Sequence, residues 1–322
     1  MMKHVYIFAI TLLLSLGVKA QQIIQPDFLK PGDKIAILSP ASLPNKKFVT
    51  SAEKVLQGWG YQTVRGAHVL QGGHGSFAGS KDDRKEDLIQ ALEDPDVKAI
   101  FCTRGGYGAI QEMQEIPFKL ISEHPKWIIG YSDITVAHCA WVNSGVMSIH
   151  GHMGEHLMKY EGKDSCSLAL KGILEGNLPT YTIPSHPMNH LGEATGMLVG
   201  GNLSVMCGTT GSYLDFFSRT EDLILFVEDV DENFDHVDRY LNLLKINGEL
   251  SRLKGIIVGQ FTGYSKNGDY PDMNYVFEQH LKDLGIPVIY NFPVGHVDLN
   301  FPLIEGATVH MKVGEKESAV LF

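Results

Sequence analysis

The sequence has too little positive charge for a protein that binds nucleic acid. Its 27 Lys and Arg residues are outnumbered by 37 Asp and Glu residues, so the formal net charge is -10 and the pI is near 5.7. No long run of Lys and Arg occurs in the chain. Because a nucleic-acid partner requires a basic face, this balance argues against one.

Cysteine is also scarce. The chain has four, Cys102, Cys139, Cys166 and Cys207, and they form no C-x-x-C pair. Cys102 falls in a buried-strand pattern and Cys139 in a helical pattern, so we interpret both as small core residues. The spacing leaves open whether a disulfide forms, but the fold is not expected to depend on one.

The first twenty residues are typical of an export signal. Lys3 gives a positive start, Val5 to Val18 is apolar, and Val18-Lys19-Ala20 offers small residues around a cut before Gln21. The stretch is shorter than the roughly 20 apolar residues of a membrane span, although an uncleaved anchor is the alternative. We therefore predict an exported, periplasmic protein and exclude residues 1–20 from the fold.

The rest of the chain is typical of an α/β protein. Predicted strands at 34–38, 63–65, 97–102 and 127–129 alternate with predicted helices, including 47–58 and 81–92. Such alternation is typical of a mostly parallel sheet with helices on both faces. Ligands bind such sheets outside the carboxyl ends of the strands.

Two domains are predicted. A polar, proline-containing stretch separates the first half from a second half with strands at 196–199, 223–227, 255–259 and 288–290, and a final edge strand at 309–313. We expect an N-terminal α/β domain at 21–165, a connector at 166–192 and a C-terminal domain at 193–322.

Ser132 is the first candidate for chemistry. It follows the apolar strand Trp127-Ile-Ile and Gly130, and a helical pattern starts just after it. A serine on a strand-to-helix turn resembles a nucleophile elbow, but Gly130-Tyr-Ser-Asp133 lacks the second glycine of G-x-S-x-G. A serine before a helix is also a common N-cap, so the pattern alone leaves both interpretations open.

A serine nucleophile needs a base, and the base needs a third group that orients it. Glu228 stands at the end of a buried strand, and His296 follows another strand in the loop Pro293-Val-Gly-His296. The order Ser, Glu, His is that of the α/β-hydrolases. The alternative is that Glu228 lies in a solvated turn and His296 is a loop histidine.

Backbone N–H groups for an oxyanion are predicted near Ser132. Gly105 and Gly106 follow a strand, and Asp133 follows the serine, so Gly106 and Asp133 are candidate donors. The alternative is that the glycines serve only the loop's dihedral angles. This loop lacks the Gly-Lys-Ser/Thr ending of a P-loop and the full G-x-G-x-x-G spacing, which disfavours phosphate binding.

Two further residues are candidates for substrate binding. Arg104 offers a fork of donors for a substrate carboxylate, or is tied to a backbone carbonyl or an acid at the sheet rim. Asn202, after Gly200-Gly201, is expected first of all to cap a helix.

A zinc site is the competing hypothesis. His152-Met-Gly-Glu-His156 fits H-x-x-E-H, which on a helix places two imidazoles on one face. Gly151 and Gly154 weaken a helix there, and no third ligand is indicated. Solvated loop histidines are the other interpretation.

Taken together, five motifs resemble those of the LD-carboxypeptidases in order and spacing, a family that includes the microcin C self-immunity proteins. They are Arg104-Gly-Gly-Tyr-Gly108, Gly130-Tyr-Ser-Asp-Ile-Thr135, Gly200-Gly-Asn-Leu-Ser204, Phe226-Val-Glu-Asp-Val230 with Asp238-Arg239, and Gly295-His296. The match runs from about Pro31 to Val313.

The resemblance implies a serine peptidase with Ser132 as nucleophile, His296 as base and Glu228 as its orienting partner. It implies an oxyanion hole of the Gly106 and Asp133 N–H groups, and an active site in the cleft between an N-terminal α/β domain and a C-terminal swivelling β/α domain. It also implies a homodimer without metal or other cofactor. The implied substrate is murein tetrapeptide, cut between meso-diaminopimelate or a similar residue and the terminal D-alanine.

The chain departs from the family at two points. The best-known members recycle murein in the cytoplasm and lack an export signal. The three tryptophans, Trp59, Trp127 and Trp141, all lie in the first half of the chain. No tryptophan follows Trp141, so the second half has none that could stack on a nucleotide as in the immunity branch. A zinc-dependent amidase using His152 and His156, and a non-catalytic murein-peptide-binding protein, are the alternative functions.

Overall fold

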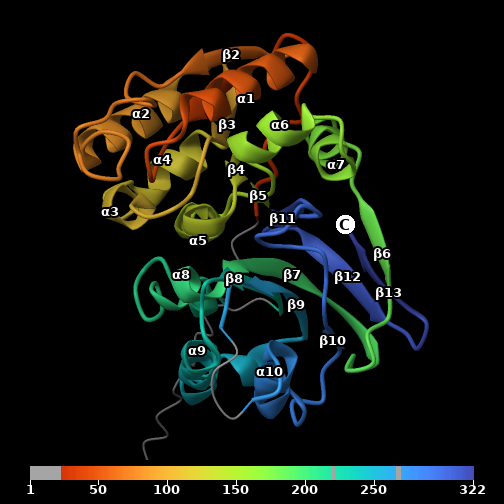
Figure 1. The fold of residues 1–322 in the computed structure, drawn as a ribbon. Helices are drawn as coiled ribbons and strands as arrows, with labels where there is room; N and C mark the ends of the chain where they lie inside the picture. The colour runs from red at the N-terminus through yellow and green to blue at the C-terminus, as the bar shows by residue number, and fades with distance from the viewer. Residues whose placement is uncertain (1–22, 220–221, 266–269) are drawn as a thin grey trace, which may run out of the picture.

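The structure is a computed structural model that describes residues 23–219, 222–265 and 270–322 (Figure 1). The predicted export signal at residues 1–20 lies outside the described residues. Within the described ranges, no helix combines the length and the apolar character needed to cross a bilayer.

The first half of the described chain is built around a six-stranded sheet of order β11-β5-β4-β3-β1-β2 (Figure 1). Strands β1 to β5 run parallel, and β11 pairs antiparallel with β5. The strands are β1 (Lys34–Leu38), β2 (Gln62–Arg65), β3 (Val97–Cys102), β4 (Trp127–Gly130), β5 (Ser148–His150) and β11 (Leu303–Glu305). The helices of this half are α1 (Lys46–Gly58), α2 (Lys81–Glu93), α3 (Ala109–Met113), α4 (Phe118–Glu123), α5 (Thr135–Asn143), α6 (Gly154–Tyr160) and α7 (Ser165–Leu174).

Both faces of this sheet are buried. Successive side chains of a strand point to opposite faces, and on each face they belong to a different hydrophobic cluster. Ile35 and Phe101 belong to one hydrophobic cluster, which also holds buried residues of α1 and α7. Ala36 and Ile100 belong to a second cluster, with buried residues of α2 and α5. This double covering explains why the strands are continuously apolar.

Several helices of this half begin at side chains that accept hydrogen bonds from the first backbone N–H groups. Asn45 caps α1, and Asp164 caps α7. Ser80 and Asp83 form a capping box at the start of α2, since each side chain accepts from the other's backbone N–H. These polar residues therefore set the helix boundaries.

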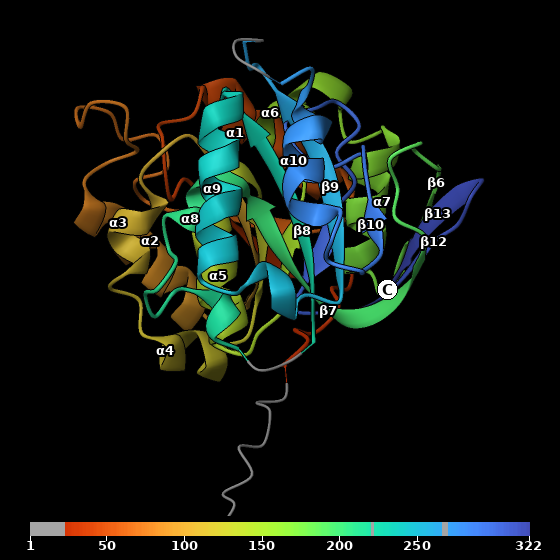
Figure 2. The ribbon, with the colours of Figure 1, turned by 90° about the horizontal axis from the view of Figure 1, so that it is seen from below.

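The second half contains a seven-stranded sheet of order β10-β9-β8-β7-β12-β13-β6. Its strands β7 to β10 are parallel, and β12, β13 and β6 continue the sheet in antiparallel pairs. The strands are β6 (Thr180–Pro184), β7 (Gly192–Asn202), β8 (Leu223–Val230), β9 (Gly255–Thr262), β10 (Val288–Ile289), β12 (Thr308–Val313) and β13 (Glu317–Leu321). The short helix α8 (Leu203–Cys207) follows β7, and α9 (Phe234–Ile246) and α10 (Met273–Leu281) lie side by side (Figure 2).

Two details differ from the sequence-based expectation. The segment 166–192, predicted as a connector, contains β6, which joins the seven-stranded sheet. The strand predicted at 309–313 is present as β12, but its predicted position at the edge of the sheet is wrong, because β12 pairs with β7 on one side and with β13 on the other. The error arises because β13 has only five residues, too few for a clear alternating signal, and was not predicted.

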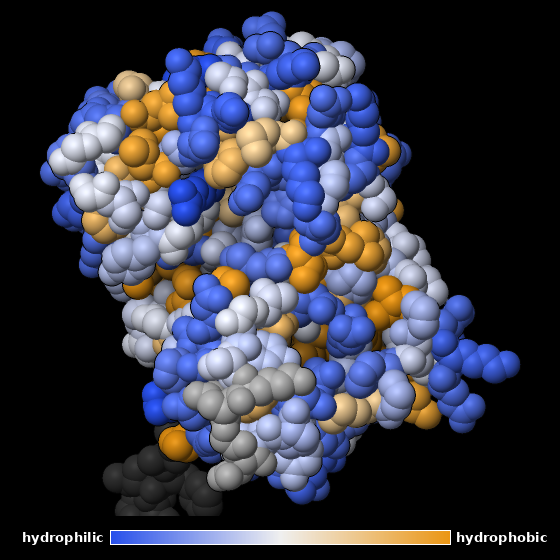
Figure 3. Space-filling view, viewed as in Figure 1, coloured by the Kyte–Doolittle hydropathy of each residue, from blue (hydrophilic) through white to orange (hydrophobic). Residues whose placement is uncertain are grey.

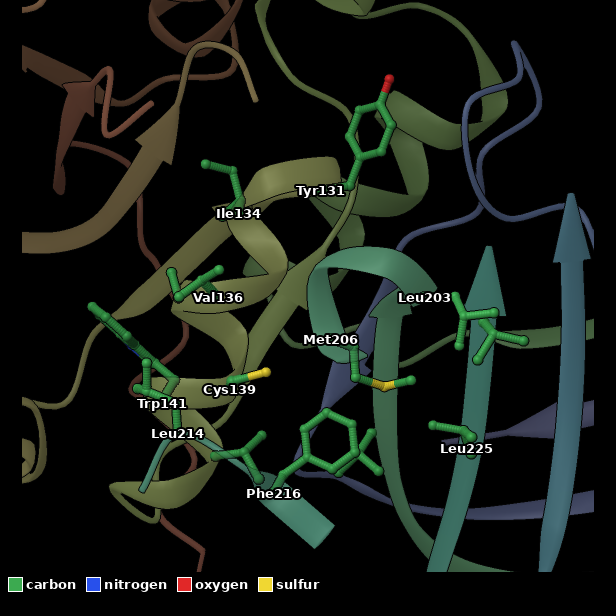
Figure 4. Close-up of a cluster of buried hydrophobic side chains, with 14 of the residues drawn as sticks. Tyr131, Ile134, Val136, Cys139, Trp141, Leu203, Met206, Leu214, Phe216 and Leu225 are labelled. Carbon is green, nitrogen blue, oxygen red and sulfur yellow. The ribbon is translucent and has the colours of Figure 1, made fainter. Parts of the chain in front are cut away.

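The two halves share one hydrophobic core. Cys139 and Trp141 of α5 lie in the same hydrophobic cluster as Met206 of α8, Leu225 of β8 and Phe216, which precedes β8 (Figure 4). All four cysteines are described, and each is buried and free.

On the face shown in Figure 3, hydrophobic side chains form patches separated by hydrophilic surface. The predicted α/β class is confirmed, whereas swivelling of one half against the other stays a prediction.

Candidate active site

Ser132 lies at the carboxyl end of β4, where the chain turns into a short 3-10 helix, η1 (Ser132–Ile134), and then α5. Its φ is 66°, a left-handed value that is rare for a residue other than glycine and is common at functional sites. The N-cap of η1 is Tyr131, so the serine hydroxyl does not cap this helix. The turn instead directs the hydroxyl toward the second half of the chain.

The three side chains predicted to act together are adjacent in the structure. Ser132 Oγ lies 3.0 Å from His296 Nε2, and His296 Nδ1 lies 2.7 Å from Glu228 Oε2. They come from the end of β4, from β8, and from the loop between β10 and β11. Because Glu228 accepts from the Nδ1–H group, Nε2 is left to accept the serine proton.

Two glycines make this approach possible. A Cβ at Gly105 would lie 2.8 Å from Ser132 Cβ, and one at Gly295 would lie 2.8 Å from Glu228 Cβ. Gly295 also has a φ of 124°, which L-residues rarely adopt. The loops that carry Gly105 and His296 can therefore reach the serine and the carboxylate only with glycine at these positions.

The charge of Glu228 sets the protonation of His296. Burial by itself would lower the pKa of His296, but the hydrogen bond and the negative charge of Glu228 outweigh it. Asp229 and Asp231 act in the same direction, so the pKa lies above its ordinary value. Glu228 is completely buried, which strengthens its effect on the imidazole.

Asp229, the next residue of β8, has a different environment. It accepts hydrogen bonds from Asn202 Nδ2 at 2.7 Å and from the Ser204 backbone N–H at 2.8 Å. Burial and the neighbouring Glu228 raise its pKa to about 6, against the opposing effect of these bonds. Asp229 thus ties the start of α8 to the strand that carries Glu228.

The predicted oxyanion donors lie against the serine turn. A Cβ at Gly105 would be 3.2 Å from the Asp133 backbone nitrogen, so the Gly105-Gly106 segment runs alongside Ser132 and Asp133. The Asp133 carboxylate accepts from the Ala109 N–H at 2.8 Å, which fixes the start of α3 to this turn. The role of the Gly106 and Asp133 N–H groups stays a prediction.

The two predicted substrate-binding residues are placed differently. Arg104 is exposed and its Nη1 donates to the Leu43 carbonyl at 3.4 Å, the backbone tie expected as one alternative. Asn202 is buried and accepts from the Val205 N–H, which confirms that it caps a helix.

The helix that the zinc motif requires does not contain both histidines. Because α6 starts at Gly154, His152 precedes the helix, and its ring stacks on that of His156 with centroids 4.0 Å apart. Ligand atoms of His152, Asp164 and Cys166 do lie within 4.8 Å of one another. However, Asp164 Oδ1 accepts from the Cys166 and Ser167 N–H groups as the cap of α7, and His152 Nδ1 lies 3.3 Å from Ser167 Oγ.

Sequence reasoning missed three residues around His296. The Tyr131 ring lies 4.9 Å from the imidazole, and it also contacts His150 at the end of β5. Asn300, four residues after His296, is buried and accepts from the Gly295 N–H at 2.9 Å. Only the polarity of Asn300 in an otherwise apolar loop end could have drawn attention to it.

A groove of about 450 Å³ lies away from these residues. It is lined by α1, α6 and the residues up to the start of α7, including Trp59 and Leu157. None of the predicted site residues lines it.

A serine, an imidazole and a carboxylate in hydrogen-bond contact on an α/β fold are typical of one class of protein, the serine hydrolases. Two family models that match the chain identify its family within this class. The model of the LD-carboxypeptidase N-terminal domain matches residues 35–151, and that of the C-terminal domain matches residues 195–311. The chain belongs to the LD-carboxypeptidase family, as its motifs predicted.

Individual relatives agree with this assignment. The chain is 34% identical over 305 residues to a probable murein peptide carboxypeptidase of Bacillus subtilis, covering 92% of this chain and 94% of the relative. It is 28% identical to the murein tetrapeptide carboxypeptidase of Pseudomonas aeruginosa, covering 82% and 88%. The crystal structure of muramoyltetrapeptide carboxypeptidase from Oxalobacter formigenes superposes with a TM-score of 0.79 at 25% identity, covering 89% and 97%. The protein is therefore an enzyme of the carboxypeptidase class.

Proposed function

We propose that this protein is a serine carboxypeptidase that hydrolyses the L,D-peptide bond before the terminal D-alanine of murein tetrapeptide. The observation that carries the proposal is the hydrogen-bonded series Ser132, His296 and Glu228 in a chain of the LD-carboxypeptidase family. The names of the relatives support the substrate class.

In the proposed reaction, Ser132 Oγ attacks the carbonyl carbon of the scissile bond while His296 Nε2 takes its proton. Glu228 keeps Nδ1 protonated and stabilises the imidazolium that forms. The N–H groups of Gly106 and Asp133 donate to the oxyanion. The C–N bond then breaks, His296 gives its proton to the amine of D-alanine, and water hydrolyses the serine ester with His296 again as base.

A carboxypeptidase acts next to a free carboxylate, and a cationic side chain is well suited to bind this end of the substrate. Arg104 is exposed, belongs to the same loop as Gly106 and has several N–H donors in a planar fork. We assign it the terminal carboxylate of the substrate. Its bond to the Leu43 carbonyl orients the guanidinium through one nitrogen.

We also propose where in the cell the enzyme acts. The export signal predicted at residues 1–20 puts the enzyme in the periplasm, where it meets peptides of the cell wall. Fractionation of cells that produce the full chain, with a cytoplasmic marker enzyme as control, tests this; recovery with the marker would contradict it. The homodimer stays a prediction that sedimentation of the purified protein decides.

D-alanine release tests the function. Protein comprising residues 21–322 is incubated with murein tetrapeptide, with the same peptide ending in L-alanine, and with EDTA. We expect D-alanine from the first peptide, no release from the second, and no effect of EDTA. Loss of activity in EDTA that zinc restores would favour the zinc amidase, and binding without release would favour a murein-peptide-binding protein.

A further inference from the structure

The loop that carries His296 is anchored in both sheets. It leaves β10 of the seven-stranded sheet at Ile289 and enters β11 of the six-stranded sheet at Leu303. Ser132 follows β4 of the six-stranded sheet, and Glu228 lies in β8 of the seven-stranded sheet. The position of the imidazole therefore depends on contacts that the loop makes with both.

Asn300 holds the residue that precedes His296. Its side chain is completely buried, and its Oδ1 accepts from the backbone N–H of Gly295 at 2.9 Å. Gly295 directly precedes His296, and its Cα is packed so closely on Glu228 that a Cβ there would lie 2.9 Å from Glu228 Oε2. A displacement of Gly295 would thus move the base relative to its carboxylate partner.

Asn300 Nδ2 and both ring nitrogens of His150 are buried, and none of the three has a hydrogen-bond partner among the other described residues. Burial lowers the pKa of His150 well below its ordinary value, and the Asn300 side chain opposes this shift.

His150 is itself held firmly. It is the last residue of β5, in register with Gly130 of β4 on one side and Leu303 of β11 on the other. Its ring lies 5.1 Å from that of Phe226, two residues before Glu228. His150 thus occupies the point where the serine strand, the glutamate strand and the end of the histidine loop meet.

We propose that Asn300 is a positioning residue for His296, which it holds in place by accepting a hydrogen bond from the Gly295 N–H. This inference rests on the proposed function, because its kinetic test measures the release of D-alanine. Asn300 touches neither the substrate nor the reacting atoms in this account. Its effect is to keep Nε2 at the serine and Nδ1 at Glu228.

The test compares Asn300→Leu, which has similar size and no hydrogen bonds, with Asn300→Asp, which keeps an acceptor for Gly295. Asn189→Leu is the matched control, because Asn189 Oδ1 accepts in the same way, at 2.8 Å, from the N–H of Tyr290, which begins the same loop six residues before His296. We expect kcat of Asn300→Leu to fall about 10- to 100-fold with KM within about twofold, since a small misplacement of a catalytic group has effects of this size. Asn300→Asp should recover most of the loss, and Asn189→Leu should stay within about twofold of the parent.

A second readout does not depend on the substrate. The His296 imidazole is titrated by NMR in protein labelled at histidine, with His296→Gln used for assignment. In Asn300→Leu its pKa should move down toward the ordinary value, because Nδ1 is held less closely to Glu228. If the parent protein releases no D-alanine, the proposed function fails, and this titration still decides the inference.

Two results would overturn the inference. One is an Asn300→Leu protein with the parent's kcat and an unshifted His296 titration; the other is an equal loss in Asn300→Leu and Asn189→Leu, which would indicate a general structural effect. Circular dichroism checks the fold of each variant. If Asn300→Leu does not fold, the smaller Asn300→Ser replaces it with the same expected direction.

Discussion

Each of the three central side chains occupies an environment that suits its proposed role. Ser132 is held at a left-handed φ that exposes its hydroxyl, and Glu228 is completely buried beside the imidazole. The resulting pKa of His296 is above its ordinary value. Since only the neutral imidazole accepts a proton, activity should rise as the pH increases through this raised pKa.

Replacement of Glu228 tests this pH dependence. Glu228→Gln keeps the shape but removes the charge that raises the pKa of His296, so the acid limb of kcat/KM should move to lower pH. The plateau of kcat should also fall by about 10²- to 10⁴-fold, because the amide no longer stabilises the imidazolium or selects its tautomer. The profile of kcat/KM against pH is the measurement.

The matched control for that profile is Glu232→Gln, which removes a charge a few residues away where Glu232 pairs with His236. Its acid limb should coincide with that of the parent. An unshifted limb in Glu228→Gln would show that Glu228 does not govern the base.

The residues that bear the proposed chemistry were predictable from sequence because their types are distinctive and each stands at a strand end. Tyr131, His150 and Asn300 were not predictable in this way. Tyr131 contacts His296 across more than a hundred residues of sequence, and the Tyr131–His150 and Asn300–Gly295 contacts join residues with no motif in common. No local spacing encodes such a contact.

At the level of elements, the active site depends on how closely the loop after β3 passes the turn after β4. Gly105 lies in the first of these segments and Ser132 in the second, with room for no Cβ between them. The Asp133 carboxylate holds the start of α3 to the same turn. The geometry of the predicted oxyanion site is therefore set by two neighbouring strand ends.

Gly105→Ala tests this packing. The added methyl group must push the loop away from Ser132, which should displace the predicted oxyanion donors and lower kcat by about 10²-fold, the usual cost of losing such a donor. Gly58→Ala is the control, because a Cβ at Gly58 meets no atom within 4 Å. Wild-type kcat in Gly105→Ala, measured by D-alanine release, would refute the close approach.

Most elements of the first half could be predicted because their apolar periodicity and capping residues agree, as at Ser80 and Asp83. The second half was harder to predict. Strands β6 and β13 have only five residues each, too few for a clear alternating signal, and lie in polar stretches, so the position of β12 inside the sheet could not be recognised. The return of β11 to the first sheet depends on three residues, too few for a periodic signal.

For the whole molecule, the shared core predicts that both halves unfold together. One hydrophobic cluster contains Trp141 of the first half and Phe216 of the second (Figure 4). Phe216 is 1% exposed, so Phe216→Ala should lower the free energy of unfolding by about 3–5 kcal/mol. Ile246→Ala, at an 82% exposed side chain, should change it by less than about 0.5 kcal/mol.

The tryptophans make the cooperativity measurable. All three lie in the first half, so their fluorescence during urea unfolding follows mainly that half, whereas circular dichroism follows the whole chain. In Phe216→Ala both midpoints should fall by the same amount. A fall in the circular dichroism midpoint with unchanged fluorescence would show that the halves unfold independently.

The central claim is that the Ser132 hydroxyl is the nucleophile, and the turnover of Ser132→Ala on murein tetrapeptide tests it most directly. The account predicts a loss of several orders of magnitude in kcat, with the tetrapeptide still bound and the fold unchanged. D-alanine release by Ser132→Ala at a rate near that of the parent would contradict it.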